Sequence, residues 1–181
     1  MANSGTLDLK RGDSTLQGRL QDGALEGPLR ISEHGRPQAS LDYRDGELHG
    51  TSTLYHPNGR ISAQLPYVRG RLHGEARFFA AEGWLQRKVS YRDGLMHGEA
   101  SSYLADGTLA EQAFYRDGVQ EGPFRRFHAS GQLAQEARYA KGVPVEQPRA
   151  YAEDGRPLDE NGKPVSRLRW WLGSRGEPSE A

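Results

Sequence analysis

The chain has 181 residues, 24 basic and 24 acidic side chains, 35% hydrophobic residues and no cysteine. Zero net charge argues against a dedicated nucleic-acid binder, and the lack of cysteine excludes disulfides, thiol catalysis and cysteine-ligated metals. The low apolar content excludes a thick core, but 8 Tyr, 5 Phe and 3 Trp are more than a disordered chain carries.

Residues 1–19 precede the regular part of the sequence, and we expect them to form an N-terminal cap. They lack the apolar run of a secretory signal, and no stretch elsewhere is long and apolar enough to span a bilayer. With Met1 as the native start, the expected location is the cytoplasm. The periplasm is the alternative if a leader has been removed.

Residues 20–158 repeat with a period of 24. Four units begin at Tyr43, Tyr67, Tyr91 and Tyr115 and align without a gap; a shorter unit precedes them and a degenerate one follows, which makes about six. Such a period indicates a repeat architecture. The columns in register are Tyr43, Tyr67, Tyr91, Tyr115 and Tyr139; Gly46, Gly70, Gly94 and Gly118; Gly50, Gly74, Gly98 and Gly122; and Gly59, Gly83, Gly107 and Gly131.

Each unit predicts two strands and two turns. Pairs such as Asn58-Gly59 separate runs that are apolar at every second position, and they favour hairpin turns. The second turn has the pattern D-G-x-x-x-G, as in Asp93 to Gly98, where glycine permits a tight reversal. The predicted fold is all-β: an elongated, single-layer antiparallel meander of tandem 24-residue β-hairpin repeats, with eleven or twelve short strands.

These units resemble the MORN-type repeat in its longer bacterial variant, Y-x-[DN]-G-x-x-[HN]-G-x-x-x-x-[YF]-x-x-x-G-x-[LI]. The resemblance covers about residues 20–158 and implies a β-meander with a role in protein or lipid association. Some similar bacterial proteins, the YwqK-like antitoxins, resemble immunity proteins that neutralise a co-encoded toxin. The pattern is broken at Arg69, where the acidic residue is missing, at Glu121, where the histidine is lost, and at Glu146, which replaces a glycine.

Two polar columns are candidate sites of chemistry. His49, His73 and His97 suggest a metal site, but equivalent positions in neighbouring repeats should lie ~10 Å apart, whereas Zn–N bonds are ~2.0–2.1 Å. We therefore expect no metal and interpret these histidines as turn-stabilising. The recurring turn aspartates are interpreted as caps of backbone N–H groups rather than as acid–base pairs. Because no nucleophile, base and orienting residue can be named together, we expect no catalytic residue and no cofactor.

The tyrosine column has two interpretations. It could be a platform on which bases or sugars stack, or it could pack each hairpin against the next. No basic groove accompanies the column, so packing is favoured and no nucleic-acid partner is expected.

Residues 159–181 are expected to form a C-terminal cap followed by a disordered tail. Within them, residues 166–172 place arginines beside Trp170 and Trp171. This stretch could anchor to a membrane surface or to a partner. The favoured interpretation is a cap over the last strand edge, which a repeat array must protect.

The predicted function is non-catalytic protein binding, most consistent with an immunity protein or antitoxin that occludes the active site of a cognate bacterial toxin or effector. Interface centres favour arginine and aromatic residues. The candidate contact residues are therefore Arg44, Arg69, Arg92, Arg116, Trp84, Trp170 and Trp171. The alternative is a lipid- or membrane-associated scaffold, which the absence of a basic excess disfavours.

Overall fold

The Asp-Gly turns are two-residue hairpin turns in which both residues have positive φ. In the computed structural model, which describes residues 4–173, Asp93 has φ 52° and Gly94 has φ 87°, and the flanking Arg92 and Leu95 pair with each other. Turns with two positive φ angles match the twist of the strands that they join, and aspartate and glycine tolerate this conformation best. The sequence prediction of a chain reversal here is confirmed.

The Asn-Gly turn, at the other end of the hairpin, is wider than expected. Asn58-Gly59 lies within the five residues 56–60 that separate two strands, and only Gly59 has positive φ, at 82°. The amide of Gly59 donates to the carbonyl of His56, and the amide of His56 donates to that of Arg60, each at 2.8 Å. The extra residues accompany a β-bulge between Leu54 and Tyr55.

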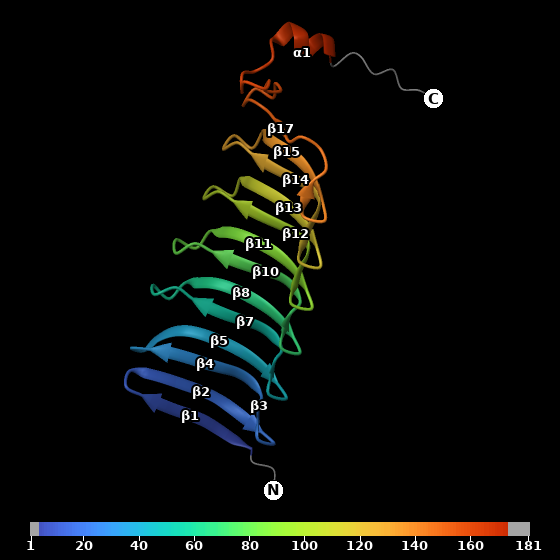
Figure 1. Cartoon of the computed structure of the whole chain (residues 1–181). Coiled ribbons are helices and arrows are strands. Elements are labelled where there is room, and N and C mark those ends of the chain that lie inside the picture. Colours follow the sequence, from blue (N-terminus) through green and yellow to red (C-terminus); the bar gives the residue numbers. More distant parts are fainter. Residues whose placement is uncertain (1–3, 174–181) are drawn as a thin grey trace.

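Together these turns produce one antiparallel sheet whose hairpins follow each other along the molecule in sequence order (Figure 1). Its strands are β1 (Gly5–Arg11), β2 (Ser14–Gln21), β3 (Ala24–Leu25), β4 (Gly27–Glu33), β5 (Arg36–Arg44), β6 (Glu47–Leu48), β7 (Gly50–Tyr55), β8 (Ile61–Val68), β9 (Arg71–Leu72), β10 (Gly74–Phe79), β11 (Leu85–Arg92), β12 (Leu95–Tyr103), β13 (Leu109–Arg116), β14 (Val119–Phe127), β15 (Leu133–Ala140), β16 (Val143–Pro144) and β17 (Arg149–Ala150). The short helix α1 (Arg167–Gly173) lies beyond the last strand. The predicted all-β meander is confirmed.

The sheet has seventeen strands rather than eleven or twelve because one strand per repeat is divided in four places, and because the expected N-terminal cap supplies the strand β1. The divided strands are β3 with β4, β6 with β7, β9 with β10, and β16 with β17. Where β12 pairs with β11, the three residues 97–99 lie opposite the single residue Ser90. In earlier repeats the same irregularity divides the strand, for example into β9 and β10. The interruption lies at the glycine of the D-G-x-x-x-G pattern, so it belongs to the repeat itself.

The core is a thin line of small side chains within this single layer. Cross-strand pairs such as Ala76 with Val89 and Ala100 with Ala113 are buried. Beside them, each tyrosine of the first column is half-buried and pairs across its hairpin with a glycine, as Tyr67 does with Gly50. The low apolar content is therefore sufficient, because no second layer has to be covered.

The two ends of the sheet differ. The hairpin β1–β2, which includes most of the expected N-terminal cap, pairs in continuous register over seven residues. At the other end β15 pairs with β14 on one side, and its outer edge pairs only with the two-residue strands β16 and β17 within the described residues. Isolated bridges from Tyr151 to Pro157 and from Leu158 to Pro164 follow. These pairings protect the last strand edge, a role that sequence analysis gave to residues 166–172. The expected disordered tail is residues 173–181: Gly173 is the last residue of α1, and 174–181 lie outside the described residues.

Candidate binding surface

The two-residue turns of successive repeats, three of them Asp-Gly, one Arg-Gly and one Lys-Gly, stack along one side of the molecule. We call this side the turn edge and define it as residues 44–49, 68–73, 92–97, 116–121 and 140–145. Each turn donates a backbone hydrogen bond to the repeat before it. The amides of Gly70, Gly94 and Gly118 donate to the carbonyls of Leu48, Leu72 and Met96 at 2.8–2.9 Å. The turn edge is therefore a ladder of backbone bonds and not a row of independent loops.

We call Gly50, Gly74, Gly98 and Gly122 the third-column glycines. The residue before such a glycine adds a side-chain contact to the turn of the next repeat. Glu121 Oε2 accepts from the Lys141 amide at 2.8 Å, and Glu26 Oε2 accepts from the Asp45 amide at 3.0 Å. His97 Nδ1 lies 3.4 Å from the amide nitrogen of Asp117 at the equivalent place. Histidine and glutamate thus occupy one structural position, and Glu121, which breaks the sequence pattern, keeps this inter-repeat contact.

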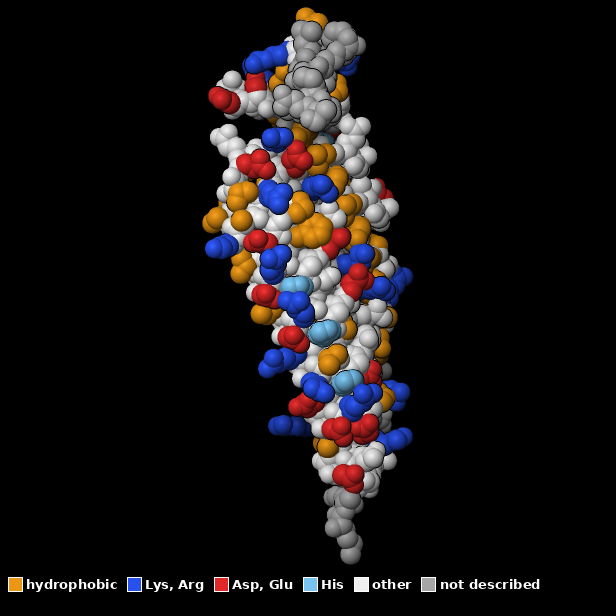
Figure 2. Space-filling view, turned by 90° about the vertical axis from the view of Figure 1, so that its right-hand side faces the viewer, with side chains coloured by type: hydrophobic (Ala, Val, Ile, Leu, Met, Phe, Trp, Pro, Cys, Tyr) orange, Lys and Arg blue, Asp and Glu red, His pale blue; other side chains and the backbone are white. Residues whose placement is uncertain are grey.

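An ion pair and polar contacts of two histidines also connect neighbouring repeats along the turn edge. Asp117 Oδ1 lies 2.9 Å from Arg92 Nη2 and 3.1 Å from His97 Nδ1. The Arg92 guanidinium, followed by the hydrogen bond from His97, lowers the pKa of Asp117 below its usual range. One repeat earlier, His73 Nδ1 lies 3.5 Å from Asp93. His73 and His97 therefore contact the turn of the following repeat, whereas His49 contacts Arg44 of its own turn. Figure 2 shows histidines on this side of the molecule among charges of both signs.

The four arginines predicted from the sequence all lie on the turn edge, but they are not equivalent. Arg92 is engaged by Asp117, and Arg44 Nη1 lies 3.2 Å from His49 Nε2. Arg44 and Arg69 also line one shallow hollow with His49. Arg116 is the last residue of β13, directly before the turn.

The predicted tryptophans lie elsewhere. Trp84 is half-buried at the wide turn before β11, on the opposite side of the sheet from the turn edge, where its carbonyl accepts the Ala80 amide at 2.9 Å. Trp170 lies on α1 and is 43% exposed. The side chain of Trp171 lies outside the described residues. The seven predicted contact residues therefore do not form one site.

Sequence analysis missed an apolar row that the structure places on the turn edge. Leu95, Val119 and Val143 follow the Asp-Gly turn, or its Lys-Gly counterpart, in three successive repeats and are 50%, 45% and 60% exposed. The Leu95 and Val119 side chains approach the turn of the next repeat, within 3.6 Å of the places where a Cβ would stand on Gly118 and Gly142. The equivalent residues of earlier repeats are Glu47 and Arg71, so the column does not show as invariant in the alignment.

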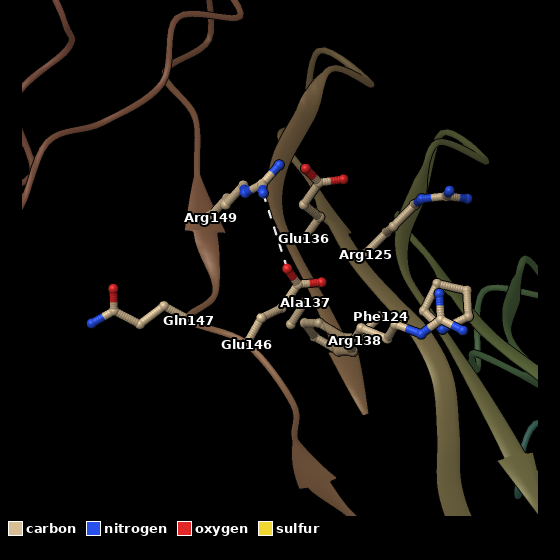
Figure 3. Close-up of a pocket in the computed structure, with 9 residues that line it drawn as sticks. Phe124, Arg125, Glu136, Ala137, Arg138, Glu146, Gln147 and Arg149 are labelled. Carbon is tan, nitrogen blue, oxygen red and sulfur yellow. Dashed lines mark ion pairs between the residues drawn. The ribbon is translucent and has the colours of Figure 1, made fainter. Parts of the chain in front are cut away.

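A second hollow of about 220 Å³ lies between β14, β15 and the segment that leads to β17 (Figure 3). It occurs where Glu146 takes the place of the third-column glycine without adopting positive φ. Glu146 lies 4.0 Å from Arg149, while the Tyr151 hydroxyl donates to Glu136 at 2.5 Å. Burial, and then this carboxylate, raise the pKa of Tyr151. The hollow is lined by both acidic and basic side chains. This mixture favours neither an anionic nor a cationic ligand.

Two other features are missing from residues 4–173. In this range no group of three or more His, Asp or Glu side chains is placed to hold a metal ion. The described part of the chain also contains no helix with the length and hydropathy of a membrane span.

The stacked turns have the spacing of a known repeat family. The model of the MORN repeat variant matches residues 48–69, 72–93, 96–117 and 120–141. The chain contains four tandem MORN repeat variants. Their period of 24 residues is the period seen in the sequence, so the MORN part of the expected resemblance is confirmed. The antitoxin part stays a prediction.

Other comparisons add no functional information. No curated protein matches the chain. Among solved structures, "Crystal structure of accessory secretory protein 1,2 and 3 in Streptococcus pneumoniae" is similar over 67% of this chain and 18% of that chain, with 9% identity and a TM-score of 0.25. The MORN-repeat chain thus spans less than a fifth of that protein, and so weak a likeness carries no argument.

Proposed function

We propose that this MORN-repeat chain is a non-catalytic protein that binds another protein through its turn edge, and that it serves as an immunity protein or antitoxin occluding the active site of a cognate toxin. MORN repeats indicate a binding role. The observation that carries the proposal is the apolar row, Leu95, Val119 and Val143, exposed beside Arg92 and Arg116.

The apolar row has the composition of an interface centre. Single exposed apolar residues are ordinary on protein surfaces, but several gathered in one place mark interaction sites. At a strand spacing of ~4.8 Å, three successive repeats place the row over roughly 20 Å, which fits within a standard protein–protein patch. The neighbouring arginines add the residue type that contributes most often to binding hot spots.

The backbone ladder beneath the row supports tight binding. The Gly118 and Gly142 amides donate to the preceding repeat at 2.9 and 3.0 Å, so the turns that carry Val119 and Val143 are held before any partner arrives. A preorganised surface loses less conformational entropy on association than a mobile loop. A firm, protruding edge is also suited to entering a concave active site, which is the usual shape of such sites.

The charge pattern favours a protein partner over an anionic membrane. The turn edge carries carboxylates as well as arginines, and Asp117 forms an ion pair with Arg92. Binding to anionic lipid requires a cluster of basic residues. The mixed pattern instead suits a partner whose own surface carries both signs.

The first experiment tests the binding edge. The full chain is used to capture the product of the neighbouring gene, and Val119→Asp is compared with Arg71→Asp, which changes the equivalent position of an earlier, charged repeat. We expect Val119→Asp to weaken capture at least about tenfold, because a charge would be placed at an apolar interface centre, and Arg71→Asp to bind nearly normally. Equal binding by both variants would exclude the apolar row as the contact.

The second experiment tests the antitoxin role separately. The neighbouring gene is expressed in cells with or without this chain, and growth is measured. Protection by the native chain and its loss with Val119→Asp are expected. Binding without any protection would leave a protein-binding edge but contradict the immunity function, and salt-sensitive sedimentation with anionic liposomes would favour a lipid scaffold instead.

A further inference from the structure

The strand β1 is an open edge of the sheet. Within the described residues it pairs only with β2, and it does so without a bulge over all seven of its residues. It contains no proline, and Leu9 is 58% exposed. Natural proteins blunt such an edge with proline, a bulge, a covering segment or charged side chains, because its free N–H and C=O groups can pair with another strand. Of these devices, β1 has only charged side chains, Asp8, Lys10 and Arg11.

At the opposite end of the same sheet, a covering segment that contains prolines protects the last strand. β1 has no such segment within the described residues. Strand β15 is followed by β16 and β17, whose combined pairing covers only parts of it, and Pro144 and Pro148 lie in this covering segment. Beyond them the chain continues through short bridges to Pro157 and Pro164. Among residues 4–173, only the N-terminal end of the sheet therefore offers a regular strand for continued pairing.

The hairpin geometry determines which groups of β1 are free. The turn of Gly12 and Asp13 has two residues, so the flanking Arg11 and Ser14 form a hydrogen-bonded pair. Hydrogen-bonded and non-hydrogen-bonded pairs alternate along antiparallel strands. The backbone groups of Leu9 thus point toward β2, and those of Asp8 and Lys10 point toward the open edge.

We propose that two copies of this chain dimerise by antiparallel pairing of β1 with β1, around a twofold axis at Leu9. In this register Asp8 of each copy lies opposite Lys10 of the other, in the hydrogen-bonded position. The two exposed Leu9 side chains face each other across the axis, where a non-hydrogen-bonded pair brings side chains closest. The sheet then continues from one copy into the other.

Charge complementarity selects a second copy and this register. A shift that centres the axis on Asp8 would oppose two carboxylates, and one centred on Lys10 would oppose two ammonium groups; like charges directly opposite destabilise a strand pair. Lys10 forms no ion pair within the described residues, whereas Asp8 accepts only an exposed hydrogen bond from Gln17 at 3.3 Å. The strand is therefore complementary to itself in one register.

In the dimer Leu9 becomes part of a continuous apolar face and is no longer exposed to water. Leu9 pairs with Leu16 in β2, and Leu16 pairs with Ile31 in β4, so these side chains share one face of the sheet. Both Leu16 and Ile31 are half-buried. Pairing with a second copy extends this face across the twofold axis and covers the exposed leucine.

The test measures the molecular mass of the full chain in solution by sedimentation equilibrium at up to about 100 µM. A chain mass of 20.1 kDa makes monomer and dimer easy to distinguish. We expect the native chain to dimerise, and Asp8→Lys or Lys10→Asp alone to raise the dimer Kd about ten- to a hundredfold, because each variant opposes two pairs of like charges. Circular dichroism and the thermal midpoint show that each variant is folded.

Charge exchange provides the decisive control. The double variant Asp8→Lys/Lys10→Asp restores opposite charges across the axis and should dimerise again. A mixture of the two single variants should form a heterodimer, since the two lysines at positions 8 and 10 of one chain then face the two aspartates at positions 10 and 8 of the other. A monomeric native chain, or single variants that dimerise as tightly as the native chain, would overturn the proposal. A failure of the dimer proposal would leave the proposed binding through the turn edge unaffected, because Asp8 and Lys10 lie outside the turn edge.

Discussion

At the scale of single residues, the third-column glycines show why the repeat tolerates so little change at one position. Gly98 has φ +97°, and a Cβ built there would lie 3.3 Å from the Cβ of Ser90 on the neighbouring strand. Both the backbone conformation and the available space therefore require glycine. Glu146, at the equivalent position near the end of the array, adopts no positive φ, and a hollow opens beside it.

This reasoning predicts that Gly98→Ala lowers the free energy of unfolding by about 1–3 kcal/mol, the usual cost of a strained residue together with a close contact. Gly107→Ala is the control, because Gly107 has φ +86° but no atom within 4 Å of an added Cβ. Urea unfolding should show a larger loss for Gly98→Ala than for Gly107→Ala. Equal losses would mean that the contact with Ser90 has no energetic effect.

At the scale of elements, the contacts between successive turns decide how one hairpin is held by the next. Backbone bonds from Gly70, Gly94 and Gly118 cross from repeat to repeat, and the histidine or glutamate before the next glycine adds a side-chain contact. These contacts explain why Glu121 can replace histidine in the pattern. Sequence analysis correctly assigned the histidines to the turns but could not identify the neighbouring turn as their partner.

The ion pair of Asp117 predicts a pH-dependent effect of Asp117→Asn. Because Arg92 and then His97 lower the pKa of Asp117 in the folded state, this carboxylate stabilises the fold above its unfolded pKa of about 3.9 and ceases to do so as pH falls through the lower folded value. Asp117→Asn should therefore lower the thermal midpoint slightly at pH 7. The difference from the native chain should shrink as pH falls through the lowered pKa of the native carboxyl and disappear once that carboxyl is neutral.

Asp45→Asn is the matched control for that measurement. Asp45 occupies the same turn position with φ 52°, but its side chain makes no ion pair within the described residues. A thermal midpoint for Asp117→Asn that stays below the native value by the same amount at pH 7 and at a pH below the folded pKa of Asp117 would show that the loss is not caused by the ion pair. The ion pair would also be excluded as the cause if Asp45→Asn lowered the thermal midpoint as much as Asp117→Asn at every pH.

At the scale of the whole molecule, the chain is a one-dimensional array. Each long strand pairs only with strands that are its neighbours in sequence, from β1 to β17, and burial is confined to small side chains between them. Stability in such arrays is approximately the sum of repeat and nearest-neighbour contributions. Length can therefore change in whole repeats without changing the architecture.

Deleting residues 67–90 tests this property, because it joins Pro66 to Tyr91 and preserves the phase of the repeat. We expect the shortened chain to keep its β-sheet circular dichroism, to unfold at a lower temperature, and to lose about 10 Å of maximum dimension in small-angle X-ray scattering, two strand spacings. Deletion of the half-repeat 67–78 is the control and should abolish folding, since it brings strands of the wrong phase together. Loss of the fold in both cases would contradict an additive array.

The sequence alone determined the elements and their order in this protein. A strict period of 24 residues, the glycine columns and the alternation around Asn58-Gly59 and Asp93-Gly94 are local signals, and local sterics convert them into turns and strands without reference to distant residues. Only the tertiary structure decided which side chains meet. The apolar row of Leu95, Val119 and Val143, the separation of Trp84 from the arginines, and the open edge at β1 arise from stacking repeats in space. A column that varies along the sequence becomes a continuous surface only when neighbouring hairpins place its members side by side.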